Sequence, residues 1–174
     1  MNLSIAKSDI IHNVCEALLA NDMETARQIV QHDYPVRDGF IDRYSGQRLV
    51  FPPVLRLLSR ALPVEFPYHP NWKMDACHLA YWELVPTVDH IVPIARGDAD
   101  DPANWITTSM LRNSAKSSWT LEELGWQLLP PGDVTMWDGL VQWFLEYTQQ
   151  NPMLLKEGYV KDWHTAIVRV LKDG

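Results

Sequence analysis

The segment from Asp89 to Ser117, which reads DHIVPIARGDADDPANWITTSMLRNSAKS, constrains the fold of this chain more than any other part of its sequence. β-Branched and aromatic residues run up to His90 and predict a strand that ends at the Asp-His pair. The stretch RGDADDPAN is typical of a loop, and WITT predicts a second short strand. Thr108 or Ser109 can then cap a helix that runs through Lys116. The predicted order is therefore strand, loop, strand, helix.

This order decides where four polar side chains can meet. Asn113 and Lys116 are three positions apart on the predicted helix, so they share a face. If that helix packs back over the two strands, Asp89 and Asn113 can approach one divalent cation from two sides. Both are oxygen donors, which suits Mg²⁺ or Mn²⁺. His90 could then take a proton from an attacking water near neutral pH, and Lys116 could offset charge on a phosphate.

The motif DHIVP…N…RNSAKS resembles the HNH, or ββα-metal (His-Me finger), endonuclease family in its Asp-His…Asn…Asn form. It is similar to the HNH domain of RNA-guided CRISPR nucleases, which also reads DHIVP and ends in an Asn-x-x-Lys-Ser turn. The spacings here are 14 residues from His90 to Asn104, nine from there to Asn113 and three from there to Lys116. The resemblance covers about residues 40–118 and is specific for 89–117.

The resemblance implies an enzyme: a metal-dependent endonuclease that hydrolyses phosphodiester bonds of nucleic acid, double-stranded DNA in particular, and leaves a 5′-phosphate. It implies that Asp89 and Asn113 bind one Mg²⁺ or Mn²⁺ ion and that His90 is the general base. It also implies that Asn104 holds the long loop and orients the His90 backbone, while Lys116 assists at the phosphate. Without the resemblance, Asp89 could be a strand-end cap, Asn104 a turn residue and His90 a core histidine.

Many members of this family carry two cysteine pairs, in CxYCG and CxxCN, that bind a structural zinc. The corresponding stretches here read DRYSG and SMLRN, which puts Asp42, Ser45, Ser109 and Arg112 at the cysteine positions. Carboxylate, hydroxyl and guanidinium groups do not replace thiolates on zinc. We therefore expect no structural zinc, and we expect Asp42 and Arg112 to pair instead.

The formal net charge of −7 is unevenly distributed along the chain. Residues 37–73 carry six basic and three acidic side chains, whereas residues 1–36 and 118–174 are net acidic. A polyanion could therefore bind locally, although the whole chain would not bind nucleic acid strongly by charge alone. Arg56 and Arg60 lie one helical turn apart, and they could contact phosphate or could equally form a solvated face. The candidate nucleic-acid-binding residues are Arg43, Arg48, Arg56, Arg60, Arg96 and Arg112.

We expect an α+β fold in three parts that form one compact unit. These are an N-terminal helical hairpin in residues 1–36, a ββα-metal nuclease core in 37–118 and a C-terminal helical extension in 119–174. Within the core, FIDRYSGQRLV predicts a small hairpin that turns at Ser45-Gly46, and PPVLRLLSRAL predicts a short helix. Downstream helices are predicted in TLEELGW, VTMWDGLVQWFLEYTQQ and YVKDWHTAIVRVLKD. The second of these carries an apolar stripe predicted to face the core: Met136, Leu140, Trp143, Phe144 and Tyr147.

A second function remains open. An HNH-like scaffold without catalysis could use its acidic helical flanks to bind a partner protein, and the lack of a second nucleic-acid-reading element favours that alternative. Cys15 and Cys77 lie far apart without a CxxC motif, and the sequence shows no signal-peptide pattern and no long apolar run. We therefore expect a cytoplasmic protein with reduced thiols and without a membrane partner.

Overall fold

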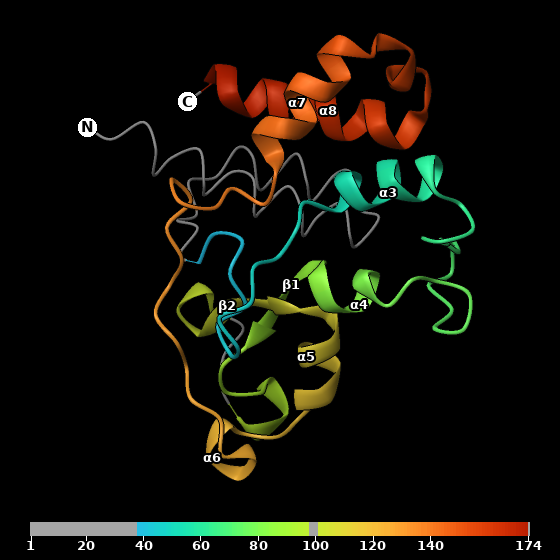
Figure 1. Ribbon diagram of the computed structural model, residues 1–174. Coiled ribbons are helices and arrows are strands. Elements are labelled where there is room, and N and C mark those ends of the chain that lie inside the picture. Colours follow the sequence, from blue (N-terminus) through green and yellow to red (C-terminus); the bar gives the residue numbers. More distant parts are fainter. Residues whose placement is uncertain (1–37, 98–100, 174) are drawn as a thin grey trace.

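The computed structural model describes residues 38–97 and 101–173, so the helical hairpin expected in residues 1–36, and Cys15 with it, lies outside the described residues. The described chain combines helices with one small antiparallel sheet, which confirms the α+β class (Figure 1). The elements are α3 (Pro52–Ala61), α4 (Ala80–Leu84), β1 (Pro86–His90), β2 (Trp105–Ser109), α5 (Met110–Lys116), α6 (Leu121–Leu124), α7 (Val141–Gln150) and α8 (Gly158–Asp173), with 3-10 helices at Ile94–Arg96, Pro102–Asn104 and Pro152–Lys156.

The sheet and α5 form the part of the fold that carries the candidate site. β1 and β2 pair antiparallel, with Asp89 opposite Ile106 and His90 opposite Trp105. The Ser109 hydroxyl caps the following helix by accepting a hydrogen bond from the third backbone N–H of α5 at 3.2 Å. α5 packs against both strands and against α4. The predicted order of strand, loop, strand and helix is confirmed.

The aromatic stretch before β1 forms the helix α4. The predicted strand is therefore wrong over these residues. Tyr81 of α4 is buried, and its hydroxyl donates to the Leu55 carbonyl of α3 at 2.9 Å. This packing outweighs the weak strand preference of aromatic residues, which depends strongly on context. The strand begins only at Pro86, and the first position of a strand tolerates proline because it needs no ladder N–H.

The predicted hairpin around Ser45 is present as a tight turn with little strand structure. Ile41 and Arg48 pair as an isolated antiparallel bridge. The backbone N–H of Arg43 has its partner outside the hairpin and donates to the Thr107 carbonyl of β2 at 2.9 Å. The hairpin is therefore shorter than predicted because its backbone groups bind the main sheet.

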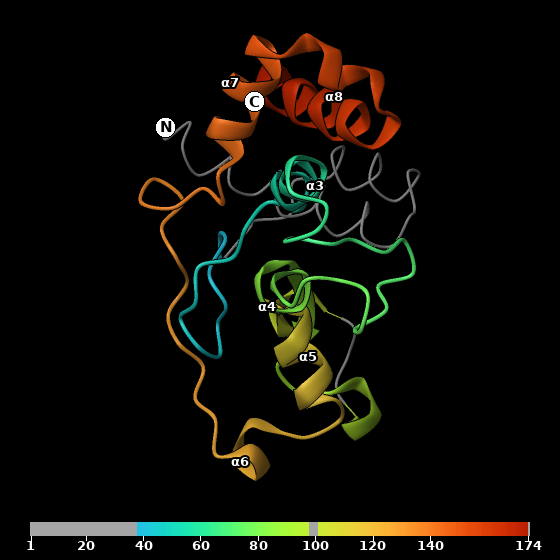
Figure 2. The ribbon, with the colours of Figure 1, turned by 45° about the vertical axis from the view of Figure 1, so that its right-hand side comes forward.

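Phe51, just before α3, lies at the centre of the apolar core and is fully buried. Its ring meets the rings of Phe144 in α7 at 5.2 Å and Trp163 in α8 at 4.9 Å, both edge to face. Aromatic pairs prefer this geometry because the positive ring edge meets the negative face. Phe51 thereby joins the segment before α3 to the two C-terminal helices, which lie together on one side of α3 (Figure 2).

α8 confirms the helix predicted from YVKDWHTAIVRVLKD. Its buried face includes Val160, Trp163 and Ile167, spaced by three and four residues as one helical face requires. No described helix, α8 included, has both the length and the apolar character needed to cross a membrane.

α7 begins at Val141, later than the sequence predicted, because the two residues before it adopt left-handed backbone conformations. Gly139 has φ 67 and Leu140 has φ 71. A side chain at position 139 would also place its Cβ 2.5 Å from the Phe40 ring, so only glycine fits. The close approach of Phe40 therefore decides where this helix starts.

The predicted core stripe of this region is correct only in part. Phe144 is fully buried in the core. Leu140 packs against the core and is partly buried. The remaining members of the stripe are exposed: Met136, Trp143 and Tyr147. The later start of α7 removes Met136 from the helix and leaves the other two on its outer face, where their rings stack at 4.9 Å.

The segment of residues 125–140 connects α6 to α7 and binds the N-terminal part of the described chain. The Leu129 N–H donates to the Arg43 carbonyl at 2.8 Å, and the Trp137 indole N–H donates to the Leu49 carbonyl at 2.7 Å. The C-terminal extension therefore contacts the core through hydrogen bonds as well as through apolar packing.

Asp42, which the sequence predicted to pair with Arg112, is buried and accepts three backbone hydrogen bonds. Oδ1 accepts from the N–H groups of Tyr44 at 2.9 Å and Ser45 at 3.1 Å. Oδ2 accepts from the N–H of Ser109 at the end of β2, at 2.9 Å. The predicted pairing of Asp42 with Arg112 is wrong, because both carboxylate oxygens bind the backbone.

Replacing Asp42 by alanine removes the acceptor for three backbone N–H groups that have little access to water. Each such group costs about 1–3 kcal/mol when it loses its partner. We expect Asp42→Ala to lower the free energy of unfolding by about 3 kcal/mol in urea titrations monitored by circular dichroism. Asp162→Ala on the exposed face of α8 is the matched control and should change it by less than about 0.5 kcal/mol. Equal effects of the two substitutions would contradict the assigned role of Asp42.

His164 on α8 provides a test of the packing between α7 and α8. Its ring lies 6.5 Å from the Phe144 ring, and partial burial lowers the pKa of His164 below its usual value. The unfolded chain therefore binds the proton more readily, so the contribution of His164 to stability is lost as the pH falls below about 6.5. We expect the difference in unfolding free energy, wild type minus His164→Gln, to decrease between about pH 7 and pH 5. A difference that stays constant over this range would contradict the packing.

Candidate functional site

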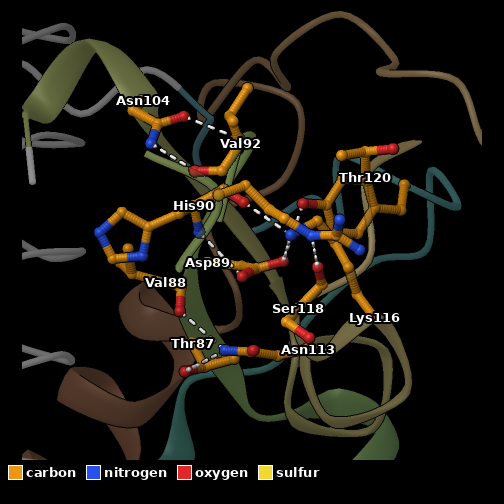
Figure 3. A network of polar contacts seen from close by, with 12 residues as sticks. Thr87, Val88, Asp89, His90, Val92, Asn104, Asn113, Lys116, Ser118 and Thr120 are labelled. Atoms are coloured by element: carbon orange, nitrogen blue, oxygen red, sulfur yellow. Dashed lines mark hydrogen bonds and ion pairs between the residues drawn. The ribbon is translucent and has the colours of Figure 1, made fainter. Parts of the chain in front are cut away.

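The helix α5 returns along β1 and brings its side chains to the end of the strand that carries Asp89 and His90 (Figure 3). Asn113 and Lys116 both reach the strand, as their shared helical face predicted. Asn104, at the end of the 3-10 helix just before β2, reaches the chain that follows β1. These residues, separated by up to 27 positions, therefore meet around one strand end.

Three hydrogen-bond donors converge on the carboxylate of Asp89, which is 7% exposed. Oδ2 accepts from the Tyr44 hydroxyl at 2.8 Å and from Lys116 Nζ at 3.2 Å. Oδ1 accepts from the backbone N–H of His90 at 2.8 Å. An ionised carboxylate offers about four acceptor positions, so these donors leave about one for a further ligand.

Lys116 is fully buried and joins the helix end to the strand end. Besides Asp89, its ammonium group donates to the His90 carbonyl at 2.7 Å. A buried ammonium group needs a counter-charge and hydrogen-bond acceptors, and these two contacts supply both. The sequence led us to expect Lys116 at a phosphate, whereas in the structure its ammonium group faces Asp89 and is shielded from solvent.

Tyr44 is a site residue that the sequence analysis missed. Burial raises the pKa of its phenol, and the neighbouring charge of Asp89 and their hydrogen bond raise that pKa further. The ring packs against Trp126 with centroids 5.4 Å apart. The signal was present in DRYSG, because Tyr44 follows Asp42 by two positions in the turn that binds β2.

Asn113 lies against the peptide bond that leads into Asp89. Its Nδ2 donates to the Val88 carbonyl at 2.8 Å and, at 3.5 Å, contacts the Thr87 hydroxyl. Since both amide heteroatoms are attached to one carbon, fixing Nδ2 also fixes the direction of Oδ1. This oxygen is available as an acceptor with respect to the described residues.

The imidazole of His90 lies on the other side of β1 from the Asp89 carboxylate (Figure 3). Neighbouring residues of a strand point to opposite faces, and β1 extends to His90, so the side chains of Asp89 and His90 point in opposite directions. The indole N–H of Trp105, the cross-strand neighbour, donates to His90 Nε2 at 3.1 Å. Nε2 is therefore an acceptor without a proton. Trp105 was not predicted as a site residue, although its place opposite His90 follows once the strand register is known.

Asn104 fastens the chain that follows His90. Its amide makes a pair of hydrogen bonds with the backbone of Val92, accepting at Oδ1 over 2.9 Å and donating from Nδ2 over 2.8 Å. Its own carbonyl accepts from the N–H of Ile91 at 2.8 Å. Asn104 is buried, and its contacts fix the two residues that follow His90.

The six arginines proposed to bind nucleic acid all have partners within the chain. Arg43 is buried and forms an ion pair with Asp38. Arg96 is exposed and pairs with Glu123 of α6 at 3.1 Å. The other four contact neighbouring residues as follows: Arg48 lies over Trp137, Arg56 over Tyr68, Arg60 pairs with Glu157, and Arg112 lies over Trp126.

Within the described ranges, no cluster of three or more His, Cys, Asp or Glu side chains could hold a metal ion. The site predicted from the sequence differs from such a cluster because it uses one carboxylate and one amide oxygen. Cys77 is buried and accepts a hydrogen bond from the His69 N–H at 3.0 Å.

Comparisons of this chain with protein-family models, with curated proteins and with solved structures found no match.

The role of Tyr44 can be tested by removing its hydroxyl alone. Tyr44→Phe keeps the ring against Trp126 but takes one donor from the buried Asp89 carboxylate. Hydrogen bonds to charged groups contribute about 1.5–3 kcal/mol, so we expect the free energy of unfolding to fall by about 2 kcal/mol in urea titrations. Tyr147→Phe, at the exposed end of a ring stack on α7, should have little effect. Comparable losses in both variants would argue against the Tyr44 contact.

Proposed function

We propose that this protein is a metal-dependent endonuclease of the HNH, or His-Me finger, type, with β1, β2 and α5 as its ββα-metal core. Its reaction is the hydrolysis of phosphodiester bonds in nucleic acid, DNA in particular, leaving a 5′-phosphate. The observation that carries the proposal is the anchoring of Asn113 on the Val88 carbonyl, directly beside Asp89. It sets two oxygen donors from separate elements at one strand end.

The donor chemistry of these two residues fits the proposed metal. Mg²⁺ and Mn²⁺ prefer oxygen ligands, and Mg²⁺ usually keeps several waters while it binds one or two carboxylates and substrate phosphate oxygens. Asp89 has about one acceptor position left, and Asn113 Oδ1 is oriented by the bond that holds its amide nitrogen. When bound, the ion would polarise the scissile phosphate and stabilise the departing 3′ oxygen.

His90 is the general base of the proposal. Nε2 carries no proton while it accepts from the Trp105 indole, so the imidazole can take up a proton at that nitrogen. Because the imidazole and the Asp89 carboxylate lie on opposite sides of β1, the imidazole would have to leave the Trp105 indole and turn toward Asp89 and Asn113 before it could take the proton of an attacking water there. Trp105 holds the imidazole in its present orientation before substrate arrives.

Lys116 and Asn104 have positioning roles in the proposal. Lys116 holds the Asp89 carboxylate and the His90 carbonyl in fixed relation, which revises its expected contact with phosphate. Asn104 holds Val92 and so fixes the path of the chain after the base. Catalytic side chains need this kind of support because small displacements of reacting groups cost large factors in rate.

The alternative is a non-catalytic scaffold of the same fold that binds a protein. Two observations favour it: Tyr44 and Lys116 already bind the Asp89 carboxylate, and the candidate arginines all have partners inside the chain. The exposed Trp143–Tyr147 stack on α7 would offer such a partner an aromatic surface. Cleavage of a nucleic acid is the property that separates the two functions.

We expect the wild-type protein to nick or cut plasmid DNA with Mg²⁺ or Mn²⁺ and not with EDTA. His90→Ala should reduce the rate by about 10²–10⁴-fold, the usual contribution of a general base, while the protein stays folded by circular dichroism. His69→Ala, a histidine in the turn before α4, is the control and should cut at the wild-type rate. Full activity of His90→Ala would remove this residue from the mechanism. Absence of metal-dependent cleavage by the wild type would favour the scaffold.

A further inference from the structure

The carboxylate proposed to bind the metal already has a cation beside it. Lys116 Nζ lies 3.2 Å from Asp89 Oδ2, and the lysine side chain is 0% exposed. Its second partner is the His90 carbonyl, at 2.7 Å. The charge of Asp89 is therefore balanced inside the protein.

This arrangement places two cations in competition for one carboxylate. A divalent ion bound to Asp89 would lie close to the ammonium group, and like charges repel strongly where water is excluded. The lysine cannot turn into solvent freely, because it is enclosed at the end of α5 and held by the backbone of the strand. Tyr44, the third donor on this carboxylate, is a neutral phenol and adds no repulsion.

We propose that Lys116 is the resident counter-ion of Asp89 and that it weakens the binding of the divalent cation. The inference rests on the proposed function and adds a residue that sets the metal affinity of the same site. Lys116 stabilises the carboxylate in the metal-free protein. The cation binds against this pre-existing charge, so the site has lower affinity than its oxygen donors alone would give.

Direct measurement of Mn²⁺ binding tests this proposal without relying on cleavage. Free Mn²⁺ is measured by electron paramagnetic resonance during titration of the wild type, Lys116→Met and Asn113→Ala. We expect Lys116→Met to bind Mn²⁺ about tenfold more tightly than the wild type, within the range usual for coupled sites. Lys161→Met, the same change at an exposed position of α8, should leave the affinity unchanged. Unchanged or weaker binding by Lys116→Met would overturn the proposal, because Lys116 would then only position Asp89.

Two further variants keep the result decisive. If Lys116→Met does not fold, Lys116→Gln removes the charge and keeps a donor for the His90 carbonyl, and the same gain in affinity is expected. The gain should vanish when Asn113→Ala is combined with either variant; a gain that survives would mean that Mn²⁺ binds elsewhere, which overturns the inference. Failure of the proposed function looks different: neither the wild type nor any Lys116 variant would bind Mn²⁺, and the inference would fall with it.

Discussion

The buried contact between Asp89 and Lys116 is the interaction on which the candidate site depends. It joins the end of β1 to the end of α5, and the Tyr44 hydroxyl adds the turn before α3 to the same carboxylate. Buried charges are costly to desolvate, so a pair of this kind is stable only when its remaining hydrogen-bonding groups have partners. Here the backbone of His90 supplies both a donor and an acceptor. The strand end is consequently held in one conformation by groups that are far apart in sequence.

A second carboxylate, that of Asp42, joins the turn at Ser45 to the end of β2. Asp42 accepts hydrogen bonds from its own turn and from the N–H of Ser109, and Ser109 in turn caps α5. In many proteins of the family that the motif resembles, two cysteine pairs bind a structural zinc ion at the positions compared with these stretches. An ionised carboxylate with several N–H donors can make the same connection through short charge-assisted hydrogen bonds. The packing of α7 and α8 around Phe51 adds apolar surface that a small ββα unit lacks by itself.

Local patterns predicted the elements whose signals lie within a few residues. The strand-loop-strand-helix order, the Ser109 cap, α3 and α8 follow from turn residues, capping residues and helical periodicity. The errors fall where distant residues decide. α4 replaces a strand because Tyr81 finds its partner in α3, and α7 starts late because Phe40 lies against Gly139. Neither contact can be recognised from the spacing of residues along the chain.

For the candidate site, the sequence by itself determined which side chains could meet. The spacing of Asn113 and Lys116 puts them on one helical face, so both side chains can reach the same strand end. Only the tertiary structure decided what each group binds. It buried Lys116 against Asp89, set Trp105 against His90 and paired the arginines within the chain. The physical reason is that periodicity specifies the direction of a side chain from its own backbone, whereas burial and hydrogen-bond partners depend on residues that folding brings from elsewhere.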